Sequence, residues 1–402
     1  MEHELGAKDK LRLSGYFSKD SFQFDPDTVY SYSNQNYALS WTHYFNDALE
    51  ATFSVGQDAY NFEVEGEDNP LNSYQYRFDI RQQFVKAQFR QEKGDRHLLS
   101  YGVHGIRYQL NPGEILPFGP ESGVISDQVA PETAMDWSIY LGDEFEINDQ
   151  WALSGGLRYN FYTYLGPQTL PVYAEGEPFL KENITGETRF QSGEPVQTYH
   201  GPEFRFSARY ALSNQSSLKA GVNSMRQNIH LLSNSSVITP TDTWKLSDSF
   251  LKPQQGIQYA LGYFKNMNQG AFEFSAELYY RSMQNLLDYR SGASIVLNDR
   301  IEQEVLVTQG KAYGMELYLK KSTGKLNGTL AYTYSRSLMQ TDPSEQKEQI
   351  NRSEWYPSNF DQPHNANFVG NLELSKRVNV TLAGKYSTGR PVTLPIAKFN
   401  YG

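Results

Sequence analysis

Apolar and polar residues alternate along most of the chain, and this period of two is typical of β-strands with one apolar and one polar face. Within residues 151–161, Trp151, Leu153 and Leu157 fall on one face, while Ser154 and Arg158 fall on the other. The same alternation recurs in residues 204–212, 272–281 and 327–337. Each stretch has about nine residues or more, whereas strands of soluble proteins usually have ~5–6. The length matches the ~9–11 residues that a tilted strand needs to cross a bilayer.

The connections between these strands are alternately short and long. Asn, Asp and Gly, which tolerate the positive φ angles of tight hairpins, mark the short ones. The short turns fall at residues 46–47, 93–95, 148–149, 214–215, 268–270, 323–325 and 376–377. The long polar connections fall near residues 110–135, 163–202, 228–256, 284–311 and 338–363. With about 55 residues per hairpin unit, this pattern places tight turns at one end of a barrel and long loops at the other, as in outer-membrane barrels. A β-propeller, with ~40–45 residues and four short strands per blade, fits less well.

We count about 15 strands, from residues 10–22 to residues 379–389. Bacterial single-chain barrels have even strand numbers, and an unpaired edge is costly in lipid. Either the count is off by one or the chain is a piece of a larger barrel, and we favour the piece. The first residues, Met1 to Gly6, have neither the basic nor the apolar region of a signal peptide. On this interpretation the chain alone should neither form a stable pore nor stay monomeric.

Composition narrows the protein classes further. The chain has 46 acidic and 36 basic residues, a net charge of −10, so a nucleic-acid partner is not expected. It has no cysteine, which excludes disulfides, a thiol nucleophile and a thiolate metal site. No apolar run approaches the ~20 residues of a membrane helix. Soluble β proteins and membrane β-barrels remain.

Candidate catalytic or metal-binding chemistry is sparse. The seven histidines, at positions 3, 43, 97, 104, 200, 230 and 364, show no metal-ligand spacing. Among Asp143, Glu144 and Glu146, the last two share the polar face of a strand, a pattern that would suit the paired carboxylates of a glycosidase. They lie beside a turn, however, where solvated acids are ordinary. Asp25 and Asp27 lack the spacing of a calcium loop and indicate a plain turn. We therefore expect no catalytic residue, metal or cofactor, and no enzyme.

One hairpin carries a resemblance to a known family. Residues 138–147 followed by residues 151–159 resemble the "Y-x-x-D-E … L-x-x-G-L-R-Y" hairpin of TonB-dependent receptor barrels, in the style of Bacteroidetes receptors. Further fragments of the same kind follow in the expected order. They are Arg226–Asn234, Pro240–Trp244, Glu277–Arg281, Ala312–Glu316, Gly324–Gly328, Tyr332–Ser335, Phe360–His364 and Thr388–Thr393.

The resemblance implies an all-β, antiparallel transmembrane barrel with a plug domain and 22 strands in the complete receptor. Residues 1–402 are then a barrel segment, with about 15 of the 22 strands, that lacks the plug and the closing strands. The implied function is energy-coupled uptake of a scarce solute across the Gram-negative outer membrane, the solute being an iron chelate, cofactor, glycan or peptide. The implied partners are outer-membrane lipid, the plug domain, the TonB energy-coupling protein, the barrel assembly machinery and an unknown small solute. A passive porin-like channel and, less favoured, a soluble carbohydrate-binding module are the alternatives.

Two groups of side chains are candidates for roles in such a barrel. Charges avoid the lipid face, so one group should face the lumen, where it would line the solute path, contact the plug or simply be hydrated. These residues are Arg158, Arg205, Arg209, Glu273, Glu277 and Arg281. Tyrosines near strand ends should form an interfacial aromatic girdle, with sugar stacking as a minor alternative. These are Tyr159, Tyr162, Tyr280 and Tyr334. The loops at residues 227–244 and 338–361 are the expected ligand-contacting surface, because loops on a rigid scaffold commonly carry recognition.

Overall fold

A computed structural model of the protein describes residues 1–233, 242–342 and 348–392, and the account below is confined to them. The structure is all-β. The long strands are β2 (Asp9–Asp25), β3 (Thr28–Asn46), β4 (Leu49–Gly66), β5 (Tyr74–Lys93), β6 (His97–Pro117), β8 (Glu132–Glu146), β9 (Trp151–Leu165), β12 (Pro195–Ser213), β13 (Ser216–Gln227), β16 (Gln254–Met267), β17 (Phe272–Tyr289), β18 (Val305–Lys321), β19 (Leu326–Thr341), β21 (His364–Ser375) and β22 (Val378–Ser387). These fifteen strands of ten or more residues confirm the strand count expected from the sequence.

Shorter elements occupy the strand ends and the long connections. The short strands are β1 (Glu2–Glu4), β7 (Asp127–Gln128), β10 (Gln168–Tyr173), β11 (Ile184–Phe190), β14 (Ile229–Leu232), β15 (Thr243–Leu246) and β20 (Tyr356–Pro357). The 3-10 turns are η1 (Pro70–Asn72), η2 (Lys181–Asn183), η3 (Ile301–Gln303) and η4 (Ile350–Ser353). Among the described residues, no helix has the length and apolar character to cross a membrane.

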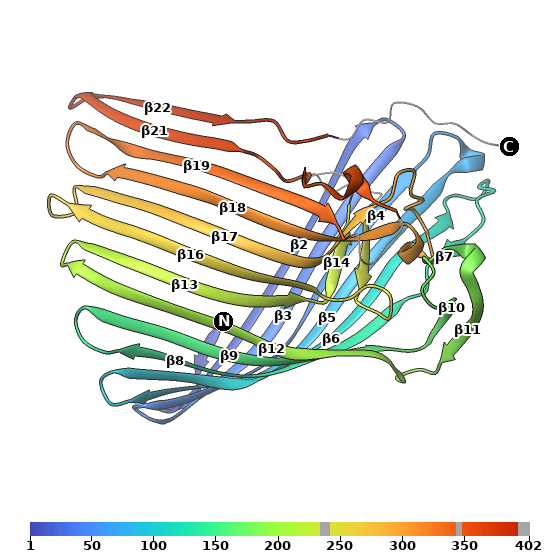
Figure 1. Ribbon diagram of the computed structural model, residues 1–402, viewed down its shortest axis with the longest axis horizontal. Coiled ribbons are helices and arrows are strands. Elements are labelled where there is room, and N and C mark those ends of the chain that lie inside the picture. The colour runs from blue at the N-terminus through green and yellow to red at the C-terminus, as the bar shows by residue number, and fades with distance from the viewer. Residues whose placement is uncertain (234–241, 343–347, 393–402) are drawn as a thin grey trace.

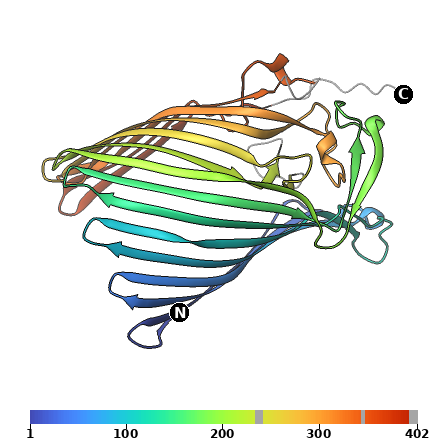
Figure 2. The same ribbon diagram turned by 60° about the horizontal axis from the view of Figure 1, so that its bottom comes forward.

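The long strands form one antiparallel meander in which each strand pairs with the next long strand along the chain. Strand β9 illustrates the register: Leu157 lies opposite Leu141 of β8 and Phe204 of β12. The sheet curls into an incomplete barrel (Figures 1 and 2). Within the described ranges its edges stay apart, because β22 pairs with β21 alone and β2 pairs with β3 and the short β1. These ranges contain no plug domain.

The turns differ at the two ends of the strands, as the sequence pattern predicts (Figure 1). At one end all connections are short, and three of these turns contain residues in the left-handed region, among them Gly94, Asn268 and Gly324 with φ values of 64°, 52° and 89°. The other end carries the long connections, with β10–β11, β14–β15 and the 3-10 turns folded into them. One connection at that end is also short: the plain turn Pro26–Asp27 between β2 and β3.

The two faces of the sheet differ in chemistry. The convex face carries a continuous band of exposed apolar side chains across neighbouring strands. Examples are Leu39, Val55, Val85, Val103, Ile139, Leu141, Leu157, Leu261, Leu278 and Leu330. Leu157 and Leu278 are 58% and 52% exposed. Because a large contiguous apolar surface is unusual on a soluble protein, this band is suited to contact with lipid.

Candidate functional site

The connection after β13 folds back onto the concave face of the sheet, where Figure 1 shows β14 between the two walls. Strands β14 and β15 pair antiparallel, with Ile229 opposite Leu246 and Leu232 opposite Thr243. We call the described residues of this connection, 228–233 and 242–253, the inner hairpin. It lies near the end of the barrel that carries the long connections.

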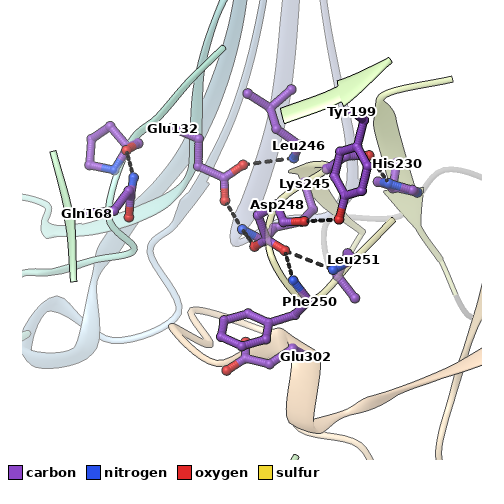
Figure 3. Close-up of polar contacts among 12 residues, drawn as sticks. Glu132, Gln168, Tyr199, His230, Lys245, Leu246, Asp248, Phe250, Leu251 and Glu302 are labelled. Carbon is purple, nitrogen blue, oxygen red and sulfur yellow. Dashed lines mark hydrogen bonds and ion pairs between the residues drawn. The ribbon is translucent and has the colours of Figure 1, made fainter. Parts of the chain in front are cut away.

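A buried ion cluster attaches the inner hairpin to the wall at β8 (Figure 3). The Lys245 ammonium contacts Glu132 of β8 and lies 2.8 Å from the Asp248 carboxylate. The second Glu132 oxygen accepts a hydrogen bond from the Leu246 amide at 2.8 Å. Burial opposes the charged form of Lys245, but the two carboxylates outweigh it and raise its pKa well above the ordinary value. Lys245 therefore stays protonated, and its ammonium lies between two acidic partners.

Tyrosines of β9 and β12 bind the turn that follows β15. The Tyr162 hydroxyl donates to the Ser247 carbonyl at 2.8 Å, and the Tyr199 hydroxyl donates to the Asp248 carbonyl at 2.7 Å. Inside the hairpin, His230 Nε2 lies 2.9 Å from Ser247 Oγ. These hydrogen bonds satisfy buried polar groups of the hairpin, as burial requires, whereas the buried Asn228 Oδ1 has no hydrogen-bond partner among the described residues.

The wall at β17, on the other side of the strands β13 and β16 that flank the hairpin in sequence, also holds the inner hairpin. The Tyr289 hydroxyl at the end of β17 donates to the Leu232 carbonyl at 3.1 Å. Leu232 and Leu251 form a buried cluster with Ile301 and Val305. A third contact is apolar, where Trp244 packs against the buried aromatic cluster of Phe62, Val64, Tyr76 and Phe78 on β4 and β5. The inner hairpin therefore touches widely separated strands of the sheet.

A pocket of about 610 Å³ lies between the inner hairpin and the long connections. Its lining includes Lys245, Asp248 and Phe250 of the hairpin and Glu132 and Tyr164 of the wall. The remaining lining residues are 128–130, 167–171, 187, 189–191, 299–300 and 302. A second pocket of about 680 Å³ adjoins it and shares Asp299 and Arg300.

The 610 Å³ pocket is lined by both aromatic and charged groups, and the Phe250 ring is one of its aromatic surfaces. Phe250 packs edge-on against Tyr173 and Phe179, with ring centroids 5.6 and 5.3 Å apart. The Tyr173 hydroxyl donates to Glu302 at 2.7 Å, and Arg300 pairs with Glu187 at 3.1 Å. Stacking surfaces beside hydrogen-bonding groups are what a pocket needs to hold a polar organic solute.

The predicted lumen-facing charges lie on the concave face by the alternation of their strands, but none of them lines either pocket. Arg158 lies 3.8 Å from Glu203, Glu273 pairs with Lys320 at 2.9 Å, and Arg281 donates to Gln258 at 3.0 Å. Arg205, Arg209 and Glu277 lie opposite Asn223, Lys219 and Glu316, respectively. Their part in a solute path or a plug contact stays a prediction.

The predicted girdle needs one correction. Tyr159, Tyr280 and Tyr334 lie on the convex face, and Tyr280 is 45% exposed. Tyr162 is fully buried on the concave face, three residues from Tyr159 and therefore of opposite parity. The prediction for Tyr162 was wrong because nearness to a strand end was given more weight than the alternation, and this tyrosine anchors the inner hairpin instead.

The expected ligand-contacting loops are placed differently from one another. The described part of residues 227–244 enters the barrel as the inner hairpin, and residues 338–361 line neither pocket within their described part. Sequence reasoning missed most pocket residues, because polar connections carry no periodicity that would bring Gln168, Glu187 and Glu302 together.

The acids near the β8–β9 turn have ordinary surroundings, with Asp143 paired to His97 at 2.7 Å. Among the described residues, no group of three or more potential ligands could hold a metal ion.

Stability should depend on pH through His230. Burial lowers its pKa to about 4, with the nearby Lys245 acting in the same direction and Asp248 against it. The unfolded chain therefore binds a proton between about pH 6.5 and 4 that the folded protein excludes. The contribution of His230 to the free energy of unfolding is therefore fully present above pH 6.5. It decreases as the pH falls toward 4, by up to about 3 kcal/mol.

Urea unfolding of the full-length protein in detergent at pH 7 and pH 4.5 would measure this effect. His230→Gln lacks the titrating group, so its stability should decrease less between the two pH values. The same decrease in the variant and the parent would show that His230 does not contribute.

Comparisons with known proteins agree with this architecture. A family model described as "TonB dependent receptor-like, beta-barrel" matches residues 5–394. No curated protein matches the chain by sequence. Among solved structures, it is similar to the ferric-catecholate import receptor Fiu of K12 E. coli, with 13% identity and a TM-score of 0.62, covering 96% of this chain and 63% of that one.

Two further solved structures have the same shape. The hemophore receptor HasR of Serratia marcescens, solved as a double mutant with its hemophore HasA and heme, has 13% identity and a TM-score of 0.65, covering 96% of this chain and 63% of that one. The ferric yersiniabactin uptake receptor FyuA of Yersinia pestis has 14% identity and a TM-score of 0.61, covering 94% and 56%. At such identities the likeness shows the fold alone, and the chain spans less than two thirds of these structures.

Proposed function

Because the chain belongs to the TonB-dependent receptor-like β-barrel family, we propose that it forms part of the barrel of an outer-membrane transporter. Members of this family are transporters and receptors, and the transporter would take up a scarce solute with energy supplied through TonB, without enzymatic chemistry. The observation that carries the proposal is the family match over residues 5–394, on a sheet whose convex face is apolar. In this proposal, residues 1–402 form one segment of a larger barrel.

The solute would belong to the classes of iron chelates, cofactors, glycans or peptides. Three similar structures bear names that refer to ferric catecholate, heme and ferric yersiniabactin. The 610 Å³ pocket beside the inner hairpin combines aromatic rings with charged groups, and the adjoining pocket adds further charged groups, which suits a polar organic solute. We infer that the solute binds here first.

The partners follow from the two faces. Outer-membrane lipid would surround the convex apolar band, and the barrel assembly machinery would insert it in a Gram-negative cell. The plug domain would occupy the concave side, where Arg158, Arg205, Arg209, Glu273, Glu277 and Arg281 would face it or the solute path. TonB would act through the plug. The family match favours this arrangement over a passive porin, and the exposed apolar band argues against a soluble module.

Growth on limiting nutrients tests the proposed function. A strain without the full-length gene would be supplied with ferric chelates, heme, cobalamin, glycans or peptides as the limiting source. We expect a growth defect on one class, and the same defect in a strain that lacks TonB. A nutrient defect that does not depend on TonB would favour the porin instead.

The orientation of the barrel can be tested with single cysteines, since the chain has none of its own. Gly176 lies in the connection between β10 and β11, at the end that we propose to be external, and Asn214 lies in the short turn between β12 and β13. A membrane-impermeant thiol reagent on intact cells should label Gly176→Cys and not Asn214→Cys. Labelling of Asn214→Cys in intact cells would reverse the topology. Ser344, a second site expected to be external, lies outside the described residues.

A further inference from the structure

We propose that the inner hairpin is a fixed crossbar that sets the upper size limit of the solute that passes through this barrel. The inference rests on the proposed function, because a size limit has meaning only in a transporter. It uses the described residues of the hairpin alone, 228–233 and 242–253.

The first observation is that the inner hairpin reaches across the concave space. On one side Lys245 contacts Glu132 of β8, and Tyr162 of β9 binds the backbone of the turn after β15. On the other side Tyr289 of β17 binds the Leu232 carbonyl. In the order of the sheet, β12, β13 and β16 separate β9 from β17. The inner hairpin therefore extends along the concave face from β8 to β17.

The contact of Trp244 links the hairpin to a more distant part of the sheet. Its indole packs against the cluster of Phe62, Val64, Tyr76 and Phe78 on β4 and β5, which lie on the far side of β8 in the order of the sheet. It also packs against the cluster that contains Leu246 and Tyr164. The hairpin is therefore supported from three directions, and side chains fill the space between it and the wall at β4 and β5.

The second observation indicates that the crossbar stays in place. Glu132 and Asp248 are almost completely buried, with side chains 4% and 2% exposed, and Lys245 is their shared cation. Pulling the hairpin away from β8 would leave Glu132 as a buried charge without its cation, and breaking such a pair is among the most destabilising changes in a protein. Asn228 adds a buried hydrogen bond to Asp136 at 2.9 Å. A lid that opened in each transport cycle would have to break all these contacts.

The third observation places the crossbar on the solute path. Lys245, Asp248 and Phe250 of the hairpin line the 610 Å³ pocket, and most of its other lining residues belong to the long connections. A solute that has bound in this pocket meets the hairpin next and must pass beside it. The remaining gap then determines which solutes pass, so the crossbar is an element that determines specificity.

Antibiotic sensitivity of cells that carry the full-length receptor tests this inference. Vancomycin is the large probe and a small β-lactam the size control. In the crossbar deletion, a Gly-Ser-Gly linker replaces residues 229–246. In the matched control, the same linker replaces residues 343–360, an equal number from the long connection between β19 and β21, whose described residues line neither pocket. Each variant is made with and without the plug domain of the full-length chain.

Without the plug, the parent barrel and the control should still exclude vancomycin, while the crossbar deletion should lower the inhibitory concentration of vancomycin at least tenfold. Sensitivity to the small β-lactam should change little among the three plug-free barrels. A parent barrel that admits vancomycin without its plug would overturn the inference. The inference would also be overturned if the crossbar deletion formed a heat-modifiable barrel on gels and still excluded vancomycin.

A milder variant guards against a deletion that fails to assemble. Trp244→Ala keeps both strands and the ion cluster but removes the indole that fills the space beside β4 and β5. We expect a several-fold lower inhibitory concentration of vancomycin without the plug, and no change would contradict the inference. If the full-length chain forms no heat-modifiable outer-membrane barrel, the proposed function itself fails. If it does and TonB-dependent growth is normal, an unchanged size limit refutes the crossbar alone.

Discussion

Lys245→Ala should lower the stability of the full-length barrel by about 3–5 kcal/mol, the usual effect of removing one partner from a buried ion pair. The lysine shares its charge between Glu132 and Asp248, and both carboxylates are buried. Without the ammonium, two negative charges would lie close together in a region with little water. They would either take up a proton or release the inner hairpin from the wall.

Urea unfolding in detergent at pH 7, followed by heat-modifiable migration on gels, would measure the loss. Lys320→Ala is the matched control, because Lys320 pairs with Glu273 at 2.9 Å and both side chains are exposed, at 38% and 41%. Water screens such a pair, so its removal should change stability little. Equal unfolding midpoints for the two variants would show that the Lys245 cluster does not hold the hairpin.

Leu157→Arg and Leu278→Arg should each reduce assembly of the full-length barrel in the outer membrane. An arginine in the middle of the lipid face costs ~2–4 kcal/mol. Leu157 lies opposite Leu141 on the convex face, and Leu278 lies opposite Leu261, so neither position offers a polar neighbour across the strand. The folded fraction, measured by heat-modifiable migration of outer-membrane protein, should drop by tenfold or more.

The neighbouring serines provide the controls. Ser154 is on the same strand as Leu157, and Ser275 is on the same strand as Leu278, but both serines have the opposite parity and lie on the concave face. Ser154→Arg and Ser275→Arg should assemble close to the parent level. If the leucine and serine variants assembled equally, the assignment of the convex face to lipid would be wrong.

The sheet could be predicted from the sequence because its strands and turns are determined by residues that are close together in the chain. Alternation assigns a face to each residue, and turns such as Lys93-Gly94-Asp95 mark where a strand reverses. These two signals suffice for the strands and for the asymmetric ends. The error at Tyr162 has the same origin, since parity alone would have placed it on the concave face beside Asn160 and Tyr164.

The inner hairpin and the pockets could not be predicted in this way. Lys245 lies in a polar connection with no period, and its partner Glu132 is 113 residues away. Tyr173 and Glu302 are separated by 129 residues. A lysine followed at the third position by an aspartate is an ordinary surface pattern in a sequence, and only the fold shows that both are buried. Contacts of this kind depend on the curvature of the sheet, which the alternation does not specify.

The same separations suggest an order of events when the chain folds. Neighbouring strands of the meander can pair as soon as each turn forms, because closing a short loop has a small entropy cost. The inner hairpin contacts Glu132 of β8 on one side and Tyr289 of β17 on the other, so its binding site does not exist until both walls have formed. We expect its docking to be a late step, slower than strand pairing. Protection of the Leu246 amide against hydrogen exchange should therefore appear after protection of strand amides such as that of Leu157.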